Sequence, residues 1–234
     1  MRQVFLAALL VGLAAATVSC NQEAGGATGL ALGNAPWSDG DRALYDWVDK
    51  SGNKAGTAEF AFARDGDAWV LSATDRLANL EQTAKVRVDA QTLKPLGGEK
   101  SIKAQGTDAK VSTTYKDSKL EIKAVVNGED RSATIDVPPD AIDNDQLLAT
   151  LRALAFAEGY EGRYTNVVGQ SAAKIATTVR VKGKETVEVP AGSFEAWRVE
   201  LDFGQAKQYA WYEVGAPHNL VQYDNGNIKL VLVE

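Results

Sequence analysis

The stretch Lys119–Val137, KLEIKAVVNGEDRSATIDV, alternates apolar and polar residues on each side of an Asn-Gly pair. Its first arm places four apolar residues on one face of an extended strand: Leu120, Ile122, Ala124 and Val126. Asn127–Gly128 is the strongest short hairpin signal, because Asn and Gly accept the positive φ angles of a type I′ turn. The stretch therefore predicts an antiparallel β-hairpin.

The same pattern recurs along the chain. TAEFAFAR (57–64), AWVLSAT (68–74) and AKVRVDA (84–90) alternate in the same way and are separated by turn residues. The pattern returns from Ala173 onward, and the final strand near 228–233 carries apolar residues on both faces, so we expect it to be covered on both. Short strands joined by turns predict a mainly β fold: a single long curved antiparallel sheet that forms a β-roll or an open barrel.

One segment interrupts the strands. Asp143 is followed three positions later by Gln146, a loose capping box that favours the start of a helix. The apolar residues that follow share a helical face: Leu147, Leu151, Leu154 and Ala155. The sequence predicts one buried helix near 143–157.

The end of this predicted helix is apolar almost all round, because Phe156 and its flanking alanines lie beside Leu154. Fully burying a Leu or Phe side chain contributes roughly 1.5–3 kcal/mol, so leaving this end in water would be costly. Either strands or a ligand must cover it. We expect an apolar slot beside Phe156 that takes one acyl chain or a similar molecule.

The N-terminal stretch predicts export. Arg2 precedes an uncharged apolar run over 4–17, which suits a signal peptide and is short for a membrane-spanning helix. The run ends in TVSC, which resembles the lipobox of bacterial lipoproteins, although Thr17 stands where Leu is usual. We expect a signal peptide over 1–19, lipid attachment at Cys20, a flexible tether over 20–36 and a single β-rich domain over 37–234. The alternative is an ordinary secretory signal that is cut elsewhere.

The lipobox resemblance also suggests a location. In lipoproteins an Asp directly after the cysteine favours retention in the inner membrane, and this chain has Asn21 there. The expected location is therefore the cell envelope, with an acyl anchor in the outer membrane and the domain facing the periplasm.

Composition narrows the classes of partner. The net charge is -6 and the basic residues do not cluster in the sequence, which argues against nucleic acid as a partner. Cys20 is the single cysteine, so no disulfide can form within the chain. His218 is the single histidine, and without cysteine partners it cannot build a usual zinc site. We expect no metal and no cofactor.

Four segments carry a resemblance to a known family: VDAQTLKPL (88–96), VEVPAGSFEAWRVEL (187–201), AWYEVGAPHNLVQYD (210–224) and LVLVE (230–234). Together they make the chain similar to the bacterial envelope family known as domain of unknown function 3108. The resemblance implies an exported, mostly β protein whose long sheet curls into a roll or open barrel. It implies no catalytic residues.

Enzymatic chemistry has weak support. Ser171, Asp202 and His218 follow the chain order of a hydrolase triad, and Ser171 lies in GQSAA. A strand follows Ser171, however, where a nucleophile elbow needs a helix. Most carboxylates alternate with apolar residues, as on the wet face of strands, so we expect no catalytic residues.

The aromatic residues favour a binding role. Several lie in predicted strands, and a curled sheet with a helix across its mouth often leaves an apolar cavity. The candidate ligand-binding residues are Leu154, Phe156, Trp69, Trp197 and Trp211. The first hypothesis is a non-enzymatic carrier of an apolar or amphipathic envelope molecule, which a cavity under the helix would favour. The second is an assembly lipoprotein that binds another envelope protein, favoured by a filled core with an exposed patch or bare edge strand. A small hydrolase is the third.

Overall fold

The computed structural model describes residues 29–234. Fifteen strands form one sheet, in the order β8-β7-β6-β5-β4-β3-β2-β1-β15-β14-β13-β12-β11-β10-β9. Their bounds are β1 Arg42–Val48, β2 Lys54–Asp65, β3 Ala68–Leu77, β4 Leu80–Asp89, β5 Pro95–Ala104, β6 Thr107–Lys116, β7 Lys119–Val126, β8 Glu129–Asp136, β9 Ala141–Asp143, β10 Glu161–Val168, β11 Ala173–Val189, β12 Gly192–Asp202, β13 Lys207–Glu213, β14 Leu220–Asp224 and β15 Lys229–Leu232. The expectation of a mainly β fold with one long sheet is confirmed.

The hairpin at Asn127–Gly128 has the predicted geometry. Both residues have positive φ angles, 52° and 85°, and β7 pairs with β8 on either side of them. On β7 the predicted inner face carries Leu120 and Ile122, which are buried. Every neighbouring pair of strands is antiparallel except β9 and β10, which are parallel.

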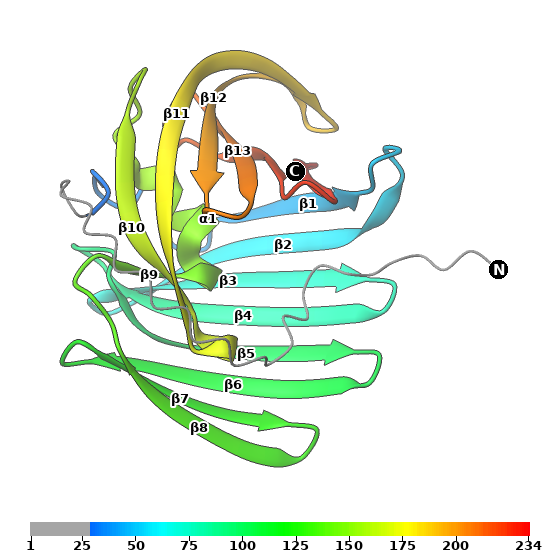
Figure 1. Cartoon of the computed structure of the whole chain (residues 1–234). Coiled ribbons are helices and arrows are strands. Elements are labelled where there is room, and N and C mark those ends of the chain that lie inside the picture. The colour runs from blue at the N-terminus through cyan, green and yellow to red at the C-terminus, as the bar shows by residue number, and fades with distance from the viewer. Residues whose placement is uncertain (1–28) are drawn as a thin grey trace.

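The sheet curls without closing. Strands β10–β13 cross above the layer formed by β1–β8, with α1 between them (Figure 1). Strand β1 joins the two halves because it pairs with β2 on one side and with β15 on the other. The long β11–β12 hairpin contains a bulge between Val181 and Gly183, and Gly183 has a φ of 122° that suits glycine. The edges of the sheet are β8 and β9, so the architecture is an open barrel.

The final strand is covered on both faces, as predicted. Leu230, Val231 and Leu232 are all buried. The tip of the β11–β12 hairpin folds back onto β15, where the Ala191 amide donates a hydrogen bond to the carbonyl oxygen of Leu232 at 3.1 Å.

The helical segment is shorter than predicted. Helix α1 covers Leu147–Thr150 and is flanked by the 3-10 turns Asn144–Gln146 and Leu151–Ala153. Asp143 caps the start, where its side chain accepts a hydrogen bond from the Asp145 amide. Leu154 is extended, so the helical conformation ends at Ala153 and not near 157. Within residues 29–234, no helix is long and apolar enough to cross a membrane.

A segment N-terminal to Trp37 explains this early end. Leu32 forms an isolated antiparallel bridge with Leu154, and the Ala155 amide donates to the carbonyl oxygen of Ala31. The Gly33 amide also donates to the carbonyl oxygen of Ala153. From Gly29, the first described residue, the chain is bonded to the sheet and the helical segment, although the domain was expected to start at Trp37. The predicted signal peptide and Cys20 lie outside the described residues.

Candidate functional site

A cavity of about 750 Å³ lies inside the curled sheet, against the start of the helical segment. Its wall combines the inner faces of β1–β4, residues 147–149 of α1 and parts of β10, β11 and β13–β15, together with the loop that follows β12. Pockets that bind small molecules commonly have volumes of about 300–1,000 Å³. This interior cavity is the candidate site. It lies between the helical segment and the sheet, where a cavity favours the carrier hypothesis and a filled core would favour the assembly hypothesis.

The apolar part of the wall follows from strand alternation. Trp47 on β1 pairs with Leu230 on β15, so both side chains point to the same inner face. Phe60, Leu148 and Ile175 bring β2, α1 and β11 into the same wall. These side chains offer aromatic and aliphatic surface on several sides of the cavity.

A polar group stands within this wall on β3. The Asp75 carboxylate accepts a hydrogen bond from Trp47 Nε1 at 2.9 Å and a longer one from Gln82 Nε2 at 3.4 Å. Burial raises the pKa of Asp75 above its ordinary value, while the two hydrogen bonds and the charge of Lys100 act in the opposite direction. Asp75 and Gln82 are cross-strand partners, so β3 and β4 place them on one face.

A second polar group lies at the start of the helical segment. Asn166 Nδ2 on β10 donates to Asn144 Oδ1 at 3.1 Å. Asp145 accepts from Lys100 Nζ at 2.8 Å, and this ion pair is mostly buried, with side-chain exposures of 21% and 8%. The cavity is therefore amphipathic.

Asp143 is a buried carboxyl just behind this group. Burial and the nearby charge of Asp145 raise its pKa to about 6, against hydrogen bonds from the Asp145 amide and from the Tyr115 hydroxyl at 2.8 Å. Asp143 holds β9 and the helical segment to β6 and does not line the cavity.

Three of the sequence-predicted site residues meet in a packed region beyond the cavity. Phe156 stacks on Trp197 with ring centroids 6.1 Å apart, and it also contacts the rings of Tyr212 at 5.6 Å and His218 at 4.9 Å. Leu154 belongs to the same hydrophobic cluster. We call Leu151, Leu154, Phe156, Trp197 and Tyr212 the packed end.

The other two predicted residues lie elsewhere. Trp69 is buried beside Trp37, with ring centroids 6.1 Å apart, in a cluster with Phe62. Trp211 lies on the outer face, where its indole donates to Glu185 and Arg198 stacks over its ring at 5.7 Å. None of the five predicted ligand-binding residues is among those that line the interior cavity.

The hydrolase residues do not form a triad. Ser171 Oγ donates to the carbonyl oxygen of Val168, His218 Nδ1 bonds the carbonyl oxygen of Glu213, and Asp202 bonds Arg180. No hydrogen bond joins any two of the three in the described part of the chain. Over the same residues, no cluster of three His, Cys, Asp or Glu side chains is suited to a metal ion.

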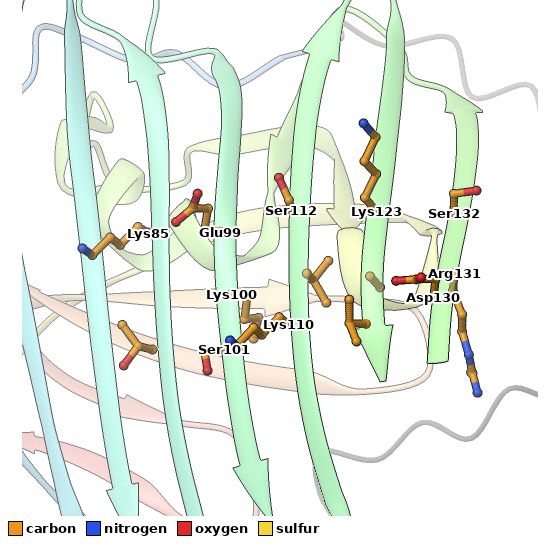
Figure 2. A pocket seen from close by; sticks show the side chains of 14 residues that line it. Lys85, Glu99, Lys100, Ser101, Lys110, Ser112, Lys123, Asp130, Arg131 and Ser132 are labelled. Carbon is orange, nitrogen blue, oxygen red and sulfur yellow. The ribbon is translucent and has the colours of Figure 1, made fainter. Parts of the chain in front are cut away.

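A second hollow of about 850 Å³ lies along β4–β8 and differs in kind. Figure 2 shows its lining, which includes Lys85, Glu99, Ser112 and Lys123 from neighbouring strands. These four side chains are exposed and belong to the outer face, where Glu99 pairs with Lys85 and with Ser112. We call this hollow the outer trough. Eleven of the fourteen residues that line it are polar or charged, so it offers a ligand few apolar side chains, whereas most residues of the interior cavity wall are apolar.

The sequence did carry a signal for the cavity residues. Asp75 continues the face of Leu71 and Ala73 on β3, and Gln82 continues the face of Ala84 and Val86 on β4. A polar residue at a position where the alternation calls for an apolar one is unusual, because its side chain then points inward and burying polar atoms is costly. Such inward-facing polar residues point to the cavity better than the predicted Trp69, Trp197 and Trp211, none of which lines it.

Comparison with known proteins supports the fold. A crystal structure of a β-barrel-like protein of domain of unknown function DUF1849 from Brucella abortus is similar, with a TM-score of 0.53 and 13% identity, over 82% of this chain and 95% of that one. A protein described as exported, with a YmcC-like fold, from Bacteroides fragilis matches at a TM-score of 0.31 and 10% identity, over 87% of this chain and 98% of that one. A protein described as a lipoprotein, from Parabacteroides distasonis, matches at a TM-score of 0.32 and 13% identity, over 89% of this chain and 99% of that one.

No curated protein matches the sequence. The family resemblance noted in the sequence is confirmed, because the family described as protein of unknown function DUF3108 matches residues 43–232. That match covers most of the chain, and the chain therefore belongs to the DUF3108 family.

Proposed function

We propose that this protein is a lipid-anchored binding or carrier module of the bacterial cell envelope that holds an apolar or amphipathic molecule in its interior cavity. The observation that carries the proposal is the cavity of about 750 Å³ between the helical segment and the sheet. Its apolar wall would bury a hydrocarbon chain, and each buried methylene group contributes about 0.8 kcal/mol.

Blocking the cavity tests the carrier role. Ala73 lines the cavity from β3, so Ala73→Trp should fill part of it. Ala63→Trp is the matched control, because Ala63 is exposed on β2 and does not line the cavity. We expect delipidated wild-type protein and the control to enhance the fluorescence of the neutral probe N-phenylnaphthylamine, and Ala73→Trp to lose most of that enhancement. Equal probe binding by all three proteins would contradict the proposal.

The proposed anchor is Cys20, which the resemblance of TVSC to a lipobox makes the first residue of the mature chain, and Asn21 after it favours the outer membrane. Intact mass should show acyl chains on the N-terminal residue, and Cys20→Ala should release the domain from membranes or leave the signal uncleaved. A wild-type protein that is soluble, unacylated and cut at another bond would overturn this part of the proposal.

A second candidate function rests on the free edge at β8. All but one of its eight residues are exposed, and among residues 29–234 β8 pairs with β7 alone. A bare edge can accept a strand from another protein, which would suit an assembly lipoprotein. Thr134→Pro would block such pairing, because proline cannot donate to an added strand. Loss of cellular function in a folded Thr134→Pro variant that still binds the probe would favour this role.

A further inference from the structure

The charges that line the interior cavity have one sign. Its lining contains the carboxyl groups of Asp75 and Asp145 and, among the described residues, no Lys, Arg or His. Lys100 pairs with Asp145 from outside the lining, which leaves Asp75 without a cationic partner in the wall. The charge of Lys100 reaches Asp75 but is paired with Asp145, so a carboxylate or phosphate brought into this low-dielectric space would meet the Asp75 charge and no unpaired cation in the lining.

Two buried acceptors in the same lining lack partners. Gln82 Oε1 and Asn166 Oδ1 form no hydrogen bond within residues 29–234, and their residues are only 9% and 1% exposed. In each case the amide nitrogen is engaged, with Asp75 for Gln82 and with Asn144 for Asn166. Both oxygens have almost no accessible surface, so a small turn of either side chain toward the cavity would present to a ligand an acceptor that no described protein group uses.

The direction of the Gln82 amide follows from its neighbour. The Asp75 carboxylate already accepts from Trp47, and a carboxylate offers acceptors alone, so it selects the NH₂ end of Gln82. The oxygen of Gln82 must then turn away from Asp75. A ligand that donates a hydrogen bond satisfies this oxygen, whereas a ligand that only accepts leaves it unpaired.

We infer that the cavity takes an amphiphile whose polar end is uncharged or cationic and donates hydrogen bonds, as a hydroxyl or ammonium group does, and that it discriminates against carboxylate amphiphiles. The inference rests on the proposed carrier function and specifies its ligand class. The apolar wall holds the chain, and Gln82, Asn166 and Asp75 select the polar end.

The test uses displacement of N-phenylnaphthylamine from the delipidated mature protein by three amphiphiles with the same alkyl chain length: monolaurin, dodecylamine and laurate. We expect monolaurin and dodecylamine to displace the probe at concentrations at least about tenfold lower than laurate, as one lost buried polar contact would give. Laurate that displaces the probe as well as the other two would overturn the inference and leave the carrier function standing. Failure of the protein to bind the probe or any of the three would instead overturn the carrier function.

Two variants assign the selectivity to named groups. Gln82→Met keeps the side-chain length and removes the acceptor, so we expect the preference for monolaurin over laurate to shrink while probe binding persists. Gln222→Met is the control, because Gln222 does not line the cavity. Asp75→Asn removes the charge and should improve displacement by laurate. If Gln82→Met fails to fold, Asp75→Asn still decides the inference, and unchanged preferences in the folded variants would overturn it.

Discussion

The packed end and the interior cavity lie inside the same curled sheet and share one helical segment, yet they are built from different residues. The packed end gathers aromatic rings in contact with one another, with Phe156 against Trp197, Tyr212 and His218. The cavity wall mixes apolar side chains with Asp75, Gln82 and Asn166, of which the two amides keep unpaired oxygens. The difference teaches that aromatic rings occur in both regions, and that inward-facing polar side chains with unpaired atoms are what distinguish the open region from the filled one.

The largest expected effect is a difference in stability loss between alanine variants of two leucines in the helical segment. Leu151 has no exposed surface and packs in the core, whereas Leu148 is partly buried and lines the cavity. Leu151→Ala should lower the free energy of unfolding by about 2–5 kcal/mol, because it leaves a void in close packing. Leu148→Ala should cost about 1 kcal/mol and weaken probe binding instead. Urea denaturation with parallel probe titration measures both, and equal stability losses would contradict the division between the two regions.

The next effect concerns Phe156, around which the sequence predicted a ligand slot. Its ring contacts three other rings, so Phe156→Ala should lower the free energy of unfolding by about 1–3 kcal/mol. Because Phe156 does not line the cavity, we expect the affinity for N-phenylnaphthylamine to change by less than about twofold, which is under 0.5 kcal/mol. A large loss of affinity with little loss of stability would place a ligand beside Phe156 after all.

A smaller effect depends on pH and involves Asp143. Its pKa is raised to about 6 by burial and the charge of Asp145, above an ordinary value of about 3.9. Between these two values the folded protein holds more protons than the unfolded chain, so the contribution of Asp143 to stability is present below pH ~4 and is lost as the pH rises through ~6. Asp143→Asn should therefore gain stability relative to wild type over this range, by roughly 1–2 kcal/mol.

Chemical denaturation of both proteins across this pH range measures the difference. Asp136→Asn provides the contrast, because the hydrogen bond and charge of Lys119 lower the pKa of Asp136. That variant should lose stability relative to wild type as the pH rises through the acid range, since the ionised form is the one that is stabilised. A flat difference for Asp143→Asn would show that this carboxyl is as well solvated as an exposed one.

The sequence predicts local features of this fold well and long-range ones poorly. Asn127–Gly128 identifies its hairpin because the turn depends on those two residues alone. The helix end depends on Leu32, which bridges Leu154 from a distant part of the chain, so no local pattern announces it. The two tryptophans of β12 and β13 look alike in sequence, but Trp197 faces inward and Trp211 outward. Trp211 pairs across the strands with Arg198, which follows Trp197 and therefore lies on the opposite face of β12. Asp75 and Gln82 interrupt the apolar alternation of β3 and β4, which the sequence does show, but only the register of the sheet places them on one face of a common cavity.

The smallest effect is expected in the outer trough, which is slightly larger than the interior cavity and still a poorer candidate. Lys123 is exposed on β7 and lines the trough, and no ion pair involving it is present among residues 29–234. Lys123→Ala removes a solvated charge and no buried contact, so both the urea midpoint and the affinity for N-phenylnaphthylamine should stay at their wild-type values. The variant also tests whether the volume of a hollow or the kind of residues that line it decides where the probe binds. If it weakened probe binding while Ala73→Trp did not, the ligand would lie along β4–β8, and unpaired buried acceptors would no longer distinguish the two hollows.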